Sequence, residues 1–390
     1  METHPVRNTY LPYACQTIDD EDIEAVVKVL KSNFLTTGPV IKEFEKKIAD
    51  YVDAKYAVAF SSGTAALHGA CFAAGIGPGD EVITSPMTFA ASANCILYQK
   101  GKAVFADIDD RTYNISPKKI EQMITDKTRA IIAVDFTGQP ANLAEIMYIA
   151  QKYNLVVIED SAHALGASYK KHKVGSISDM TMFSFHPVKH ITTGEGGMIT
   201  TNSEDYYQKL LLFRSHGITR DPSLLIDNNG PWYYEMQYLG HNFRMTDIQA
   251  ALGISQLQKL DDFLKIRKNL VSQYNNAFKD METVQIPFQE KDRESSWHLY
   301  ILRLNSNKLS GKRRKIVEAL LEQNIGVNVH YIPVYLHPYY QKLGYDKGLC
   351  PIAEKLYEEI ITLPLFPGMK EKDVMDVITA VKKVIKSFLV

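Results

Sequence analysis

The stretch YAVAFSSGTAALHGACFAAG, residues 56–75, decides the fold class. Its first five residues form a short apolar run of strand length, and the Ala-rich segment after them has a helical pattern. Between the two lie Ser61, Ser62 and Gly63, small residues of the kind that form tight turns. A strand, a turn and a helix in this order are the repeating unit of an α/β protein.

The same unit recurs along the first half of the chain. Successive apolar runs are mostly separated by helical patterns of about 10–15 residues, which is the spacing of β–α–β units. The runs are rich in Val, Ile and Ala on both faces, as expected of parallel strands that helices cover on both sides. The sequence therefore predicts an α/β domain with a mainly parallel seven-stranded sheet, from residues 56–60, 81–86, 103–108, 129–136, 155–160, 180–185 and 196–201.

Segments outside this sheet predict the rest of the organisation. Apolar residues at helical spacing predict helices over 19–32 and 44–51, and a long helix over 244–280. After Trp297 the pattern changes to strand, helix, strand and two closing helices, with the strands over 298–304 and 326–332. We expect three parts: a large domain with an N-terminal arm (1–245), a bridging long helix (246–285) and a smaller C-terminal α+β domain (286–390).

Composition excludes several classes of protein. Lysine plus arginine is 44 and aspartate plus glutamate is 45, so the chain lacks the excess of cations that nucleic-acid binding requires. The densest basic run, residues 170–173, is most simply a solvated hairpin tip. No apolar run approaches the roughly 18 residues of a membrane-spanning helix, and the polar N-terminal segment does not resemble a targeting signal. The four cysteines form no CxxC, so we expect a cytoplasmic, reduced protein without a metal site.

An open α/β sheet binds ligands at the carboxyl ends of its strands, so the chemistry should lie just after the predicted strands. The first strand ends in Ser61 to Leu67, where small residues open a helix. Backbone N–H groups at such a helix start form a cradle for phosphate. The alternative is an ordinary capped helix with Ser62 or Thr64 as N-cap. Neither GxxxxGK[ST] nor GxGxxG follows a strand, which argues against nucleoside triphosphates and dinucleotides.

Two ionisable residues stand at the ends of later strands. Asp160 ends the fifth run, and a buried carboxylate is costly unless it meets a partner charge or donors. Its alternative role is to cap the next turn. Lys189 lies between two apolar runs and before a glycine-rich turn, where burial would lower its pKa as a Schiff-base lysine requires. The same glycines could also form an ordinary hairpin.

The combination of these features predicts a pyridoxal phosphate site. The phosphate needs the N–H donors and hydroxyls of the first turn. A carboxylate near the pyridine nitrogen, here Asp160, keeps that nitrogen protonated, so that the ring can accept electrons. Phe89, in PMTFAAS, supplies an aromatic face for the ring. The aldehyde needs an amine, for which Lys189 is the candidate.

At this point the chain resembles the DegT/DnrJ/StrS family of nucleotide-sugar aminotransferases over almost its whole length. The motifs are SSGTAALHGA, PMTFAASAN, FADID, EDSAHALGA, SFHPVKHITTGEGGMITTN, LGHNFRMTDIQAALGISQL and VHYIPVYLHPYY. The resemblance implies the pyridoxal-phosphate-dependent transferase fold of type I, like that of aspartate aminotransferase. It also implies pyridoxal 5′-phosphate as the cofactor and a homodimer with shared active sites.

The resemblance assigns roles to individual residues. Lys189 would bond the cofactor and then carry protons, and Asp160 would pair with the pyridinium nitrogen. The other residues near the cofactor would be His163 by the ring hydroxyl, Phe89 on the ring, Gly63, Thr64 and Ser184 at the phosphate, and Asn242 from the other subunit. The sugar-nucleotide site would be lined by Tyr13, Asn33, Phe34, Leu35, Thr36, Ser62, Ser184, Asn242, His330, Tyr331, Ile332, Pro333 and Tyr335. For 330–335 the alternative is a proline-rich turn that packs its aromatic side chains.

Within the family, the phrases SNFLTTGP, AVDFTGQP and MQYLGHNFRMTDIQAALG most resemble the branch that aminates C4 of a nucleotide sugar in pseudaminic acid biosynthesis. This implies L-glutamate as amino donor and a UDP-linked 4-keto-6-deoxy sugar as acceptor. Asp135 and Thr37 depart from residues common in the family, which affects only fine substrate recognition. Three alternatives stay open: amination of another 3-keto or 4-keto sugar, a dehydratase, and a non-catalytic sensor or scaffold. Dehydratase relatives replace the lysine with histidine, so Lys189 argues against that reading.

Overall fold

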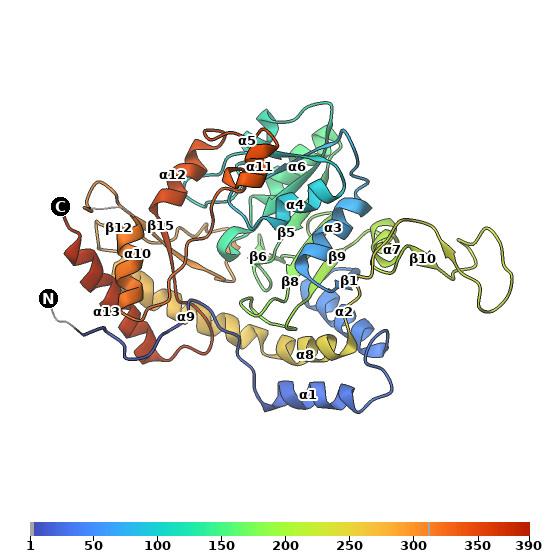
Figure 1. Ribbon diagram of the computed structural model, residues 1–390, viewed down its shortest axis with the longest axis horizontal. Coiled ribbons are helices and arrows are strands. Elements are labelled where there is room, and N and C mark those ends of the chain that lie inside the picture. Colours follow the sequence, from blue (N-terminus) through green and yellow to red (C-terminus); the bar gives the residue numbers. More distant parts are fainter. Residues whose placement is uncertain (1–3, 311–312) are drawn as a thin grey trace.

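The computed structural model describes residues 4–310 and 313–390. A large α/β body fills the centre of Figure 1, a smaller unit with both termini lies to its left, and a thin hairpin extends to the right. None of the helices in the described residues combines the length and apolarity needed to cross a membrane.

The large body is built on a seven-stranded sheet, which confirms the predicted architecture. The strand order is β1-β9-β8-β5-β4-β2-β3. β9 runs antiparallel to both of its neighbours, and the other pairs are parallel. The bounds are β1 Tyr56–Phe60, β2 Glu81–Thr84, β3 Lys102–Phe105, β4 Thr128–Val134, β5 Val156–Asp160, β8 Met180–Ser184 and β9 Gly197–Thr201.

Successive side chains along the strands belong to separate hydrophobic cores on the two faces of the sheet. Ile132 of β4 joins the core that contains α3 and α4, whereas its neighbour Ile131 joins the core under α6. Because both faces are covered, the strands carry apolar residues at nearly every position. The helices of the large body are α2 Pro39–Val52, α3 Gly63–Ala73, α4 Ala91–Tyr98, α5 Pro117–Gln122, α6 Leu143–Tyr153 and α7 Glu204–Phe213.

α2 begins five residues earlier than the helix expected over 44–51, because a distant side chain caps it. Asp247 accepts hydrogen bonds from the backbone N–H groups of Gly38 and Val40, at 2.8 and 2.9 Å. These donors have no partner inside the helix, so the carboxylate supplies one. Pro39 at the first helical position needs no donor and has a suitable φ.

The long helix expected over 244–280 is two helices with a corner between them. α8 covers Asp247–Gln258 and α9 covers Leu260–Phe278. At the corner, the Lys259 ammonium lies 3.0 Å from the buried Asp22 carboxylate of α1 (Asp20–Leu30), which packs along α8. The expectation of one continuous helix was therefore wrong, because contacts with α1 fix the corner. Figure 1 shows α1 beneath α8.

The smaller C-terminal α+β domain is organised around an antiparallel sheet. Its strands are β12 Val284–Gln285, β14 Tyr300–Leu304 and β15 Ile360–Leu363. Its helices are α10 Arg313–Glu322 and α13 Glu371–Ser387, whereas α11 Pro338–Lys342 and α12 Pro351–Glu359 place buried residues in the core of the large body. The N-terminal arm crosses to this domain, where the Arg7 guanidinium binds the carboxylates of Asp373 and Asp376 at 2.7 and 2.8 Å.

The strand expected over 326–332 does not form. The segment makes a single bridge, between Asn328 and Thr362. Its start is held by the arm instead, because the Gly326 N–H donates to the Leu11 carbonyl at 2.7 Å. The remainder continues into the cavity described below rather than along a sheet.

Two short hairpins complete the fold. β6 Ser168–Tyr169 and β7 His172–Lys173 pair with each other, and β13 Arg293–Glu294 joins them. Lys170 and Lys171 form their exposed turn, which confirms the predicted hairpin tip. β10 Ile218–Thr219 and β11 Glu235–Met236 form the base of the projecting hairpin in Figure 1.

Candidate active site

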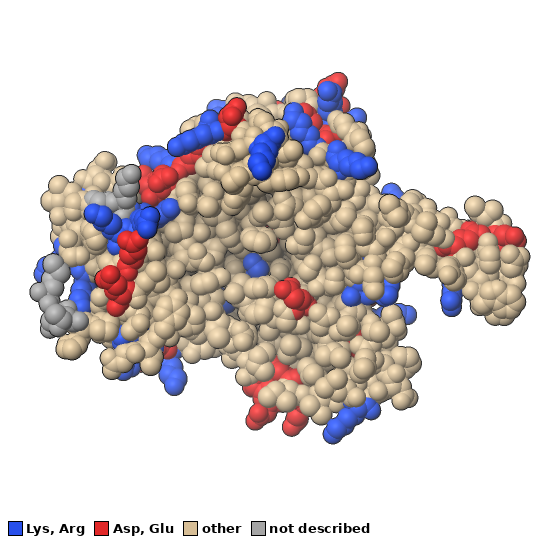
Figure 2. All heavy atoms as spheres, viewed as in Figure 1, with Lys and Arg blue, Asp and Glu red and all other residues tan. Residues whose placement is uncertain are grey.

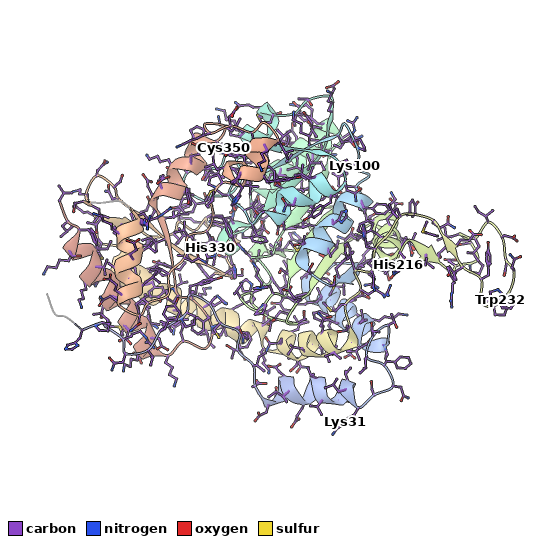
Figure 3. All side chains as sticks on the ribbon, in the orientation of Figure 1. Lys31, Lys100, His216, Trp232, His330 and Cys350 are labelled. Carbon is purple, nitrogen blue, oxygen red and sulfur yellow. The ribbon has the colours of Figure 1, made fainter. Side chains whose placement is uncertain are left out.

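A cavity of about 550 Å³ opens at the carboxyl ends of β1, β5 and β8. Figure 2 shows a hollow near the middle of the molecular face with basic side-chain atoms inside it, and Figure 3 labels His330, a lining residue, in the same region. The predicted residues that the cavity brings together are Tyr13, Ser62, Gly63, Thr64, Phe89, Asp160, His163, Ser184, Lys189, His330 and Tyr331.

One end of the cavity is the turn between β1 and α3. The Ser62 hydroxyl accepts a hydrogen bond from the Ala65 N–H at 3.1 Å, so the alternative role of Ser62 as N-cap is confirmed. A Cβ on Gly63 would lie 3.3 Å from the Ser184 Cβ, which shows how closely this turn approaches β8. Helix α3 therefore presents its unpaired N–H groups and positive dipole end beside Thr64 and Ser184, an arrangement that suits a phosphate.

Lys189 lies in the turn after β8, where its N–H donates to the His186 carbonyl at 2.9 Å. Burial lowers the pKa of its amine to about 8, and the nearby Asp160 carboxylate partly opposes that shift. An amine with this pKa is about one-tenth uncharged at pH 7, a far larger fraction than for an ordinary lysine, and the uncharged amine is the form that attacks an aldehyde.

Asp160 ends β5 and is 5% exposed. It accepts hydrogen bonds from the Ser92 hydroxyl at 2.5 Å and from the Ala162 N–H at 3.2 Å. Burial raises the pKa of this carboxyl, and these two donors and the charge of Lys189 oppose the shift. The alternative role of Asp160, capping the next turn, is thus confirmed by the hydrogen bond from Ala162 to Oδ1. The other carboxylate oxygen, Oδ2, accepts from Ser92.

The far wall of the cavity carries imidazole and phenol groups. Burial, with a smaller effect from the Lys189 charge, places the pKa of His163 well below its usual value, so its ring is neutral. Its Nδ1 is buried and has no hydrogen-bond partner in the described chain, whereas its Nε2 lies 3.3 Å from the Tyr331 hydroxyl. Phe89 is 63% exposed toward the cavity mouth, with its ring centroid 6.3 Å from that of Tyr331.

These groups fit pyridoxal phosphate. The helix start suits its phosphate, the unpartnered His163 nitrogen suits a ring substituent, and the exposed face of Phe89 suits the ring. The Asp160 carboxylate and the Lys189 amine would meet the ring nitrogen and the aldehyde.

Several predicted residues lie outside the cavity. Asn33, Phe34, Leu35 and Thr36 are exposed in the loop after α1, and Asn242 is exposed beside the projecting hairpin. Ile332 is exposed, and Pro333 is buried.

Tyr335 corrects a prediction. Its side chain is fully buried, its hydroxyl donates to the Glu354 carboxylate at 2.6 Å and accepts from the Cys350 N–H at 3.1 Å. With its hydroxyl occupied inside the core, it does not line the cavity. The alternative interpretation of this part of the turn, in which it packs its aromatics, is therefore the better one.

Sequence reasoning missed some cavity residues. The polar ones are Thr88, His186, Glu195 and Asn328. Thr88 stands in the PMTFAAS motif beside Phe89, so its place there could have signalled it. Asn328 could not be found, because it was assigned to a strand that does not form.

The model of the DegT/DnrJ/EryC1/StrS aminotransferase family matches residues 16–382. The chain belongs to this family. The resemblance inferred from the motifs is therefore confirmed, as are the type I fold, the cofactor pyridoxal phosphate and the activity of a sugar aminotransferase.

Relatives of known name agree with this assignment. Spore coat polysaccharide biosynthesis protein SpsC of Bacillus subtilis is 44% identical over 97% of the chain and 98% of its own length. The UDP-4-amino-4,6-dideoxy-N-acetyl-beta-L-altrosamine transaminase of Campylobacter jejuni is 39% identical over 93% of the chain and 94% of its own length.

Solved structures show the same fold. PseC of Helicobacter pylori, an aminotransferase of pseudaminic acid biosynthesis, has a TM-score of 0.91 at 33% identity and covers 97% of this chain and 100% of its own. Spr1654 of Streptococcus pneumoniae, solved in a PLP form and a PMP form, also reaches 0.91 at 33% identity. For the PLP form, the match covers 98% of this chain and 100% of the other.

Proposed function

We propose that this enzyme moves the amino group of L-glutamate to C4 of a UDP-linked 4-keto-6-deoxy-N-acetylhexosamine, UDP-2-acetamido-2,6-dideoxy-beta-L-arabino-hexos-4-ulose, in pseudaminic acid biosynthesis. The main support is a cavity that combines the low-pKa amine of Lys189 with the Asp160 carboxylate, in a chain 39% identical to a transaminase whose name gives a 4-amino sugar, UDP-4-amino-4,6-dideoxy-N-acetyl-beta-L-altrosamine. The cavity alone supports amino transfer, and the relative supports this choice of sugar.

Different residues of the chain have different roles in the proposed amino transfer. Pyridoxal phosphate, when bound, supplies the electron sink and carries the amino group between the two substrates. Asp160 holds the proton of the ring nitrogen, and the helix start at Gly63 and Thr64 binds the phosphate. Lys189, once its amine is free, takes the proton from the α-carbon of glutamate and later delivers a proton to C4 of the sugar. A base with a pKa near the working pH suits both transfers.

The sugar nucleotide would enter past the aromatic residues at the mouth of the cavity. The ring centroids of Tyr13 and His330 lie 5.4 Å apart, and His330 Nδ1 lies 2.8 Å from the Thr362 hydroxyl. Burial lowers the pKa of His330 to about 3, so its ring stays neutral beside the sugar. We expect Tyr13, His330 and Tyr331 to contact this substrate.

A homodimer would complete the site. The hairpin around β10 and β11 projects from the body, and Figure 3 labels Trp232 near its tip. Monomeric proteins rarely expose large contiguous apolar patches, and exposed apolar side chains that gather on one segment mark a site of protein association. Asn242 follows the hairpin and is exposed, so a second copy that covers this surface would bring Asn242 to the partner's cavity. The large apolar side chains exposed here are Leu224, Ile226, Trp232, Tyr234, Met236, Tyr238 and Leu239.

A second candidate is amination of another nucleotide keto sugar, one that feeds a spore-coat or capsule polysaccharide. The specific observation in its favour is the 44% identity to SpsC, which exceeds the identity to the altrosamine transaminase.

One assay distinguishes the candidates. The enzyme is offered L-glutamate with a panel of UDP- and dTDP-linked 3-keto and 4-keto sugars, and each aminosugar is identified by NMR. Our proposal predicts preferred turnover of the UDP-linked 4-keto sugar with amination at C4. Preference for a dTDP-linked or a 3-keto sugar would overturn it in favour of the second candidate.

A further inference from the structure

Two hydroxyl groups lie in line behind Asp160. The Ser92 Oγ is 2.5 Å from the Asp160 Oδ2, and the Thr88 Oγ1 is 2.6 Å from the Ser92 Oγ. All three side chains are almost fully buried, with exposed fractions of 3% for Thr88, 0% for Ser92 and 5% for Asp160. Ser92 does not line the cavity, and Thr88, which does, has no assigned contact with the cofactor or the sugar.

The negative charge of Asp160 determines which hydroxyl is the donor in each of these two hydrogen bonds. A carboxylate only accepts, so Ser92 must donate its single proton to Asp160. Because that proton is used, the contact between Thr88 and Ser92 is made by the proton of Thr88. Both hydroxyl groups then direct their protons toward the Asp160 carboxylate, and hydrogen bonds linked in this way strengthen one another.

The Ser92 hydroxyl has no role in starting its own helix. Helix α4 begins at Ala91, and its N-cap, Ala90, makes no side-chain cap. Ser92 is the second residue inside α4 rather than its N-cap, and its hydroxyl faces Asp160 of β5. The Ser92 hydroxyl also lies 3.3 Å from the Phe89 carbonyl oxygen. Ser92 therefore links Asp160 to the segment that carries Phe89.

We propose that Ser92 and Thr88 are positioning residues that keep Asp160 charged and fixed as the partner of the cofactor's pyridine nitrogen. This inference rests on the proposed pairing of Asp160 with that nitrogen. Without the two donors, Asp160 becomes a stronger base, and the proton between carboxylate and ring moves from the nitrogen to the carboxylate. The ring then accepts electrons less well, and proton removal from glutamate slows.

The test compares S92A and T88V with the wild type, all reconstituted with pyridoxal phosphate labelled with ¹⁵N in the ring. The ¹⁵N chemical shift reports whether the nitrogen carries the proton. We expect the wild type to show the protonated shift and S92A to move toward the unprotonated shift, with T88V between them. We also expect the rate of the glutamate half-reaction to fall about tenfold to a hundredfold in S92A, the range for one hydrogen bond to a charge, with less change in KM.

Three further variants separate this role from a merely structural one. T88S keeps the hydroxyl and should restore the ring-nitrogen signal that T88V loses. T84V removes another buried hydroxyl, which donates to the Ile132 carbonyl at 3.1 Å, and should leave the ring-nitrogen signal unchanged. D160N should lose the protonated signal altogether.

The outcomes distinguish the two proposals. If D160N loses the protonated signal while S92A and T88V keep it, the inference about the hydroxyls is overturned and the role of Asp160 stands. If D160N itself keeps the protonated signal, the pairing of Asp160 with the ring fails, and this inference fails with it. A shift in T84V equal to that in S92A would also overturn the inference, because any lost buried hydroxyl would then suffice.

Discussion

At the scale of single residues, the behaviour of Lys189 follows from two opposed effects. Burial penalises its ammonium form, and the Asp160 carboxylate favours that form, with a resulting pKa of about 8. Below that pH the amine is protonated and cannot attack an aldehyde, and above it the amine is free. The position of Lys189 in the turn after β8 therefore places its amine in the cavity and also sets the pKa that controls its reactivity.

We predict that capture of pyridoxal phosphate by the cofactor-free enzyme accelerates as pH rises, with a midpoint near 8. Stopped-flow absorbance of the yellow product measures the rate at each pH. D160N removes the charge that raises the pKa of the amine, so its midpoint should lie lower than that of the wild type. A midpoint near 10.5, the ordinary value for lysine, would show that the amine is not buried as described.

The residues that sequence could identify are those whose place is fixed by a strand end. Asp160 ends one buried strand and Lys189 follows another, and parallel strands bring such positions to one edge of a sheet. Tyr335 was assigned wrongly because the direction of a side chain in a turn depends on distant partners, here Glu354. Ser92 was not recognised, because its contact with Asp160 joins residues 68 positions apart.

At the scale of elements, the turn from β1 to α3 depends on the strand beneath it. A Cβ on Gly197 of β9 would lie 2.5 Å from the Ser62 carbonyl oxygen and 2.7 Å from the Gly63 nitrogen. These are backbone atoms that cannot move aside without shifting the start of α3. Gly197 is thus required by close approach of two backbones rather than by an unusual φ.

We predict that G197A weakens pyridoxal phosphate binding at least about tenfold and lowers the free energy of unfolding by about 1–3 kcal/mol, the usual cost of overpacking. Fluorescence titration of the cofactor-free enzyme and thermal unfolding measure the two effects. G77A is the matched control, because nothing lies closer than 3.9 Å to its added Cβ. Normal cofactor affinity in G197A would mean that this turn does not hold the phosphate.

Elements were predictable where burial alone decides them. The seven strands of the sheet carry apolar residues on both faces, and the sequence placed them within a few residues of their observed bounds. The corner at Lys259 and the missing strand at 326–332 were not predictable. They depend on Asp22 and on Leu11, residues that lie far away in the sequence and leave no local pattern.

At the scale of overall shape, the projecting hairpin carries exposed apolar side chains that the proposed homodimer would cover. Ile226 is 92% exposed and Leu239 is 80% exposed, on a segment that extends away from the body in Figure 1. Burial of such side chains favours association by about 25 cal/mol per Å² of apolar surface removed from water. The proposed homodimer would cover them and would bring Asn242 to the partner's cavity.

We predict that the wild type sediments as a dimer, and that I226D/L239D shifts toward the monomer and loses most of its aminotransferase activity. Analytical ultracentrifugation with a parallel activity assay checks both expectations. Y148D serves as the control, since Tyr148 is 67% exposed on α6 and away from the hairpin. A fully active wild-type monomer would contradict the shared site.

We propose that Lys189 is the residue that bonds the cofactor. Reduction of the reconstituted enzyme with borohydride, followed by peptide mapping, fixes the pyridoxyl group to whichever amine had bonded it. We predict a single labelled peptide with the mass increase on Lys189, and no label and no turnover in K189A. A label on another lysine, or an active K189A enzyme, would contradict it.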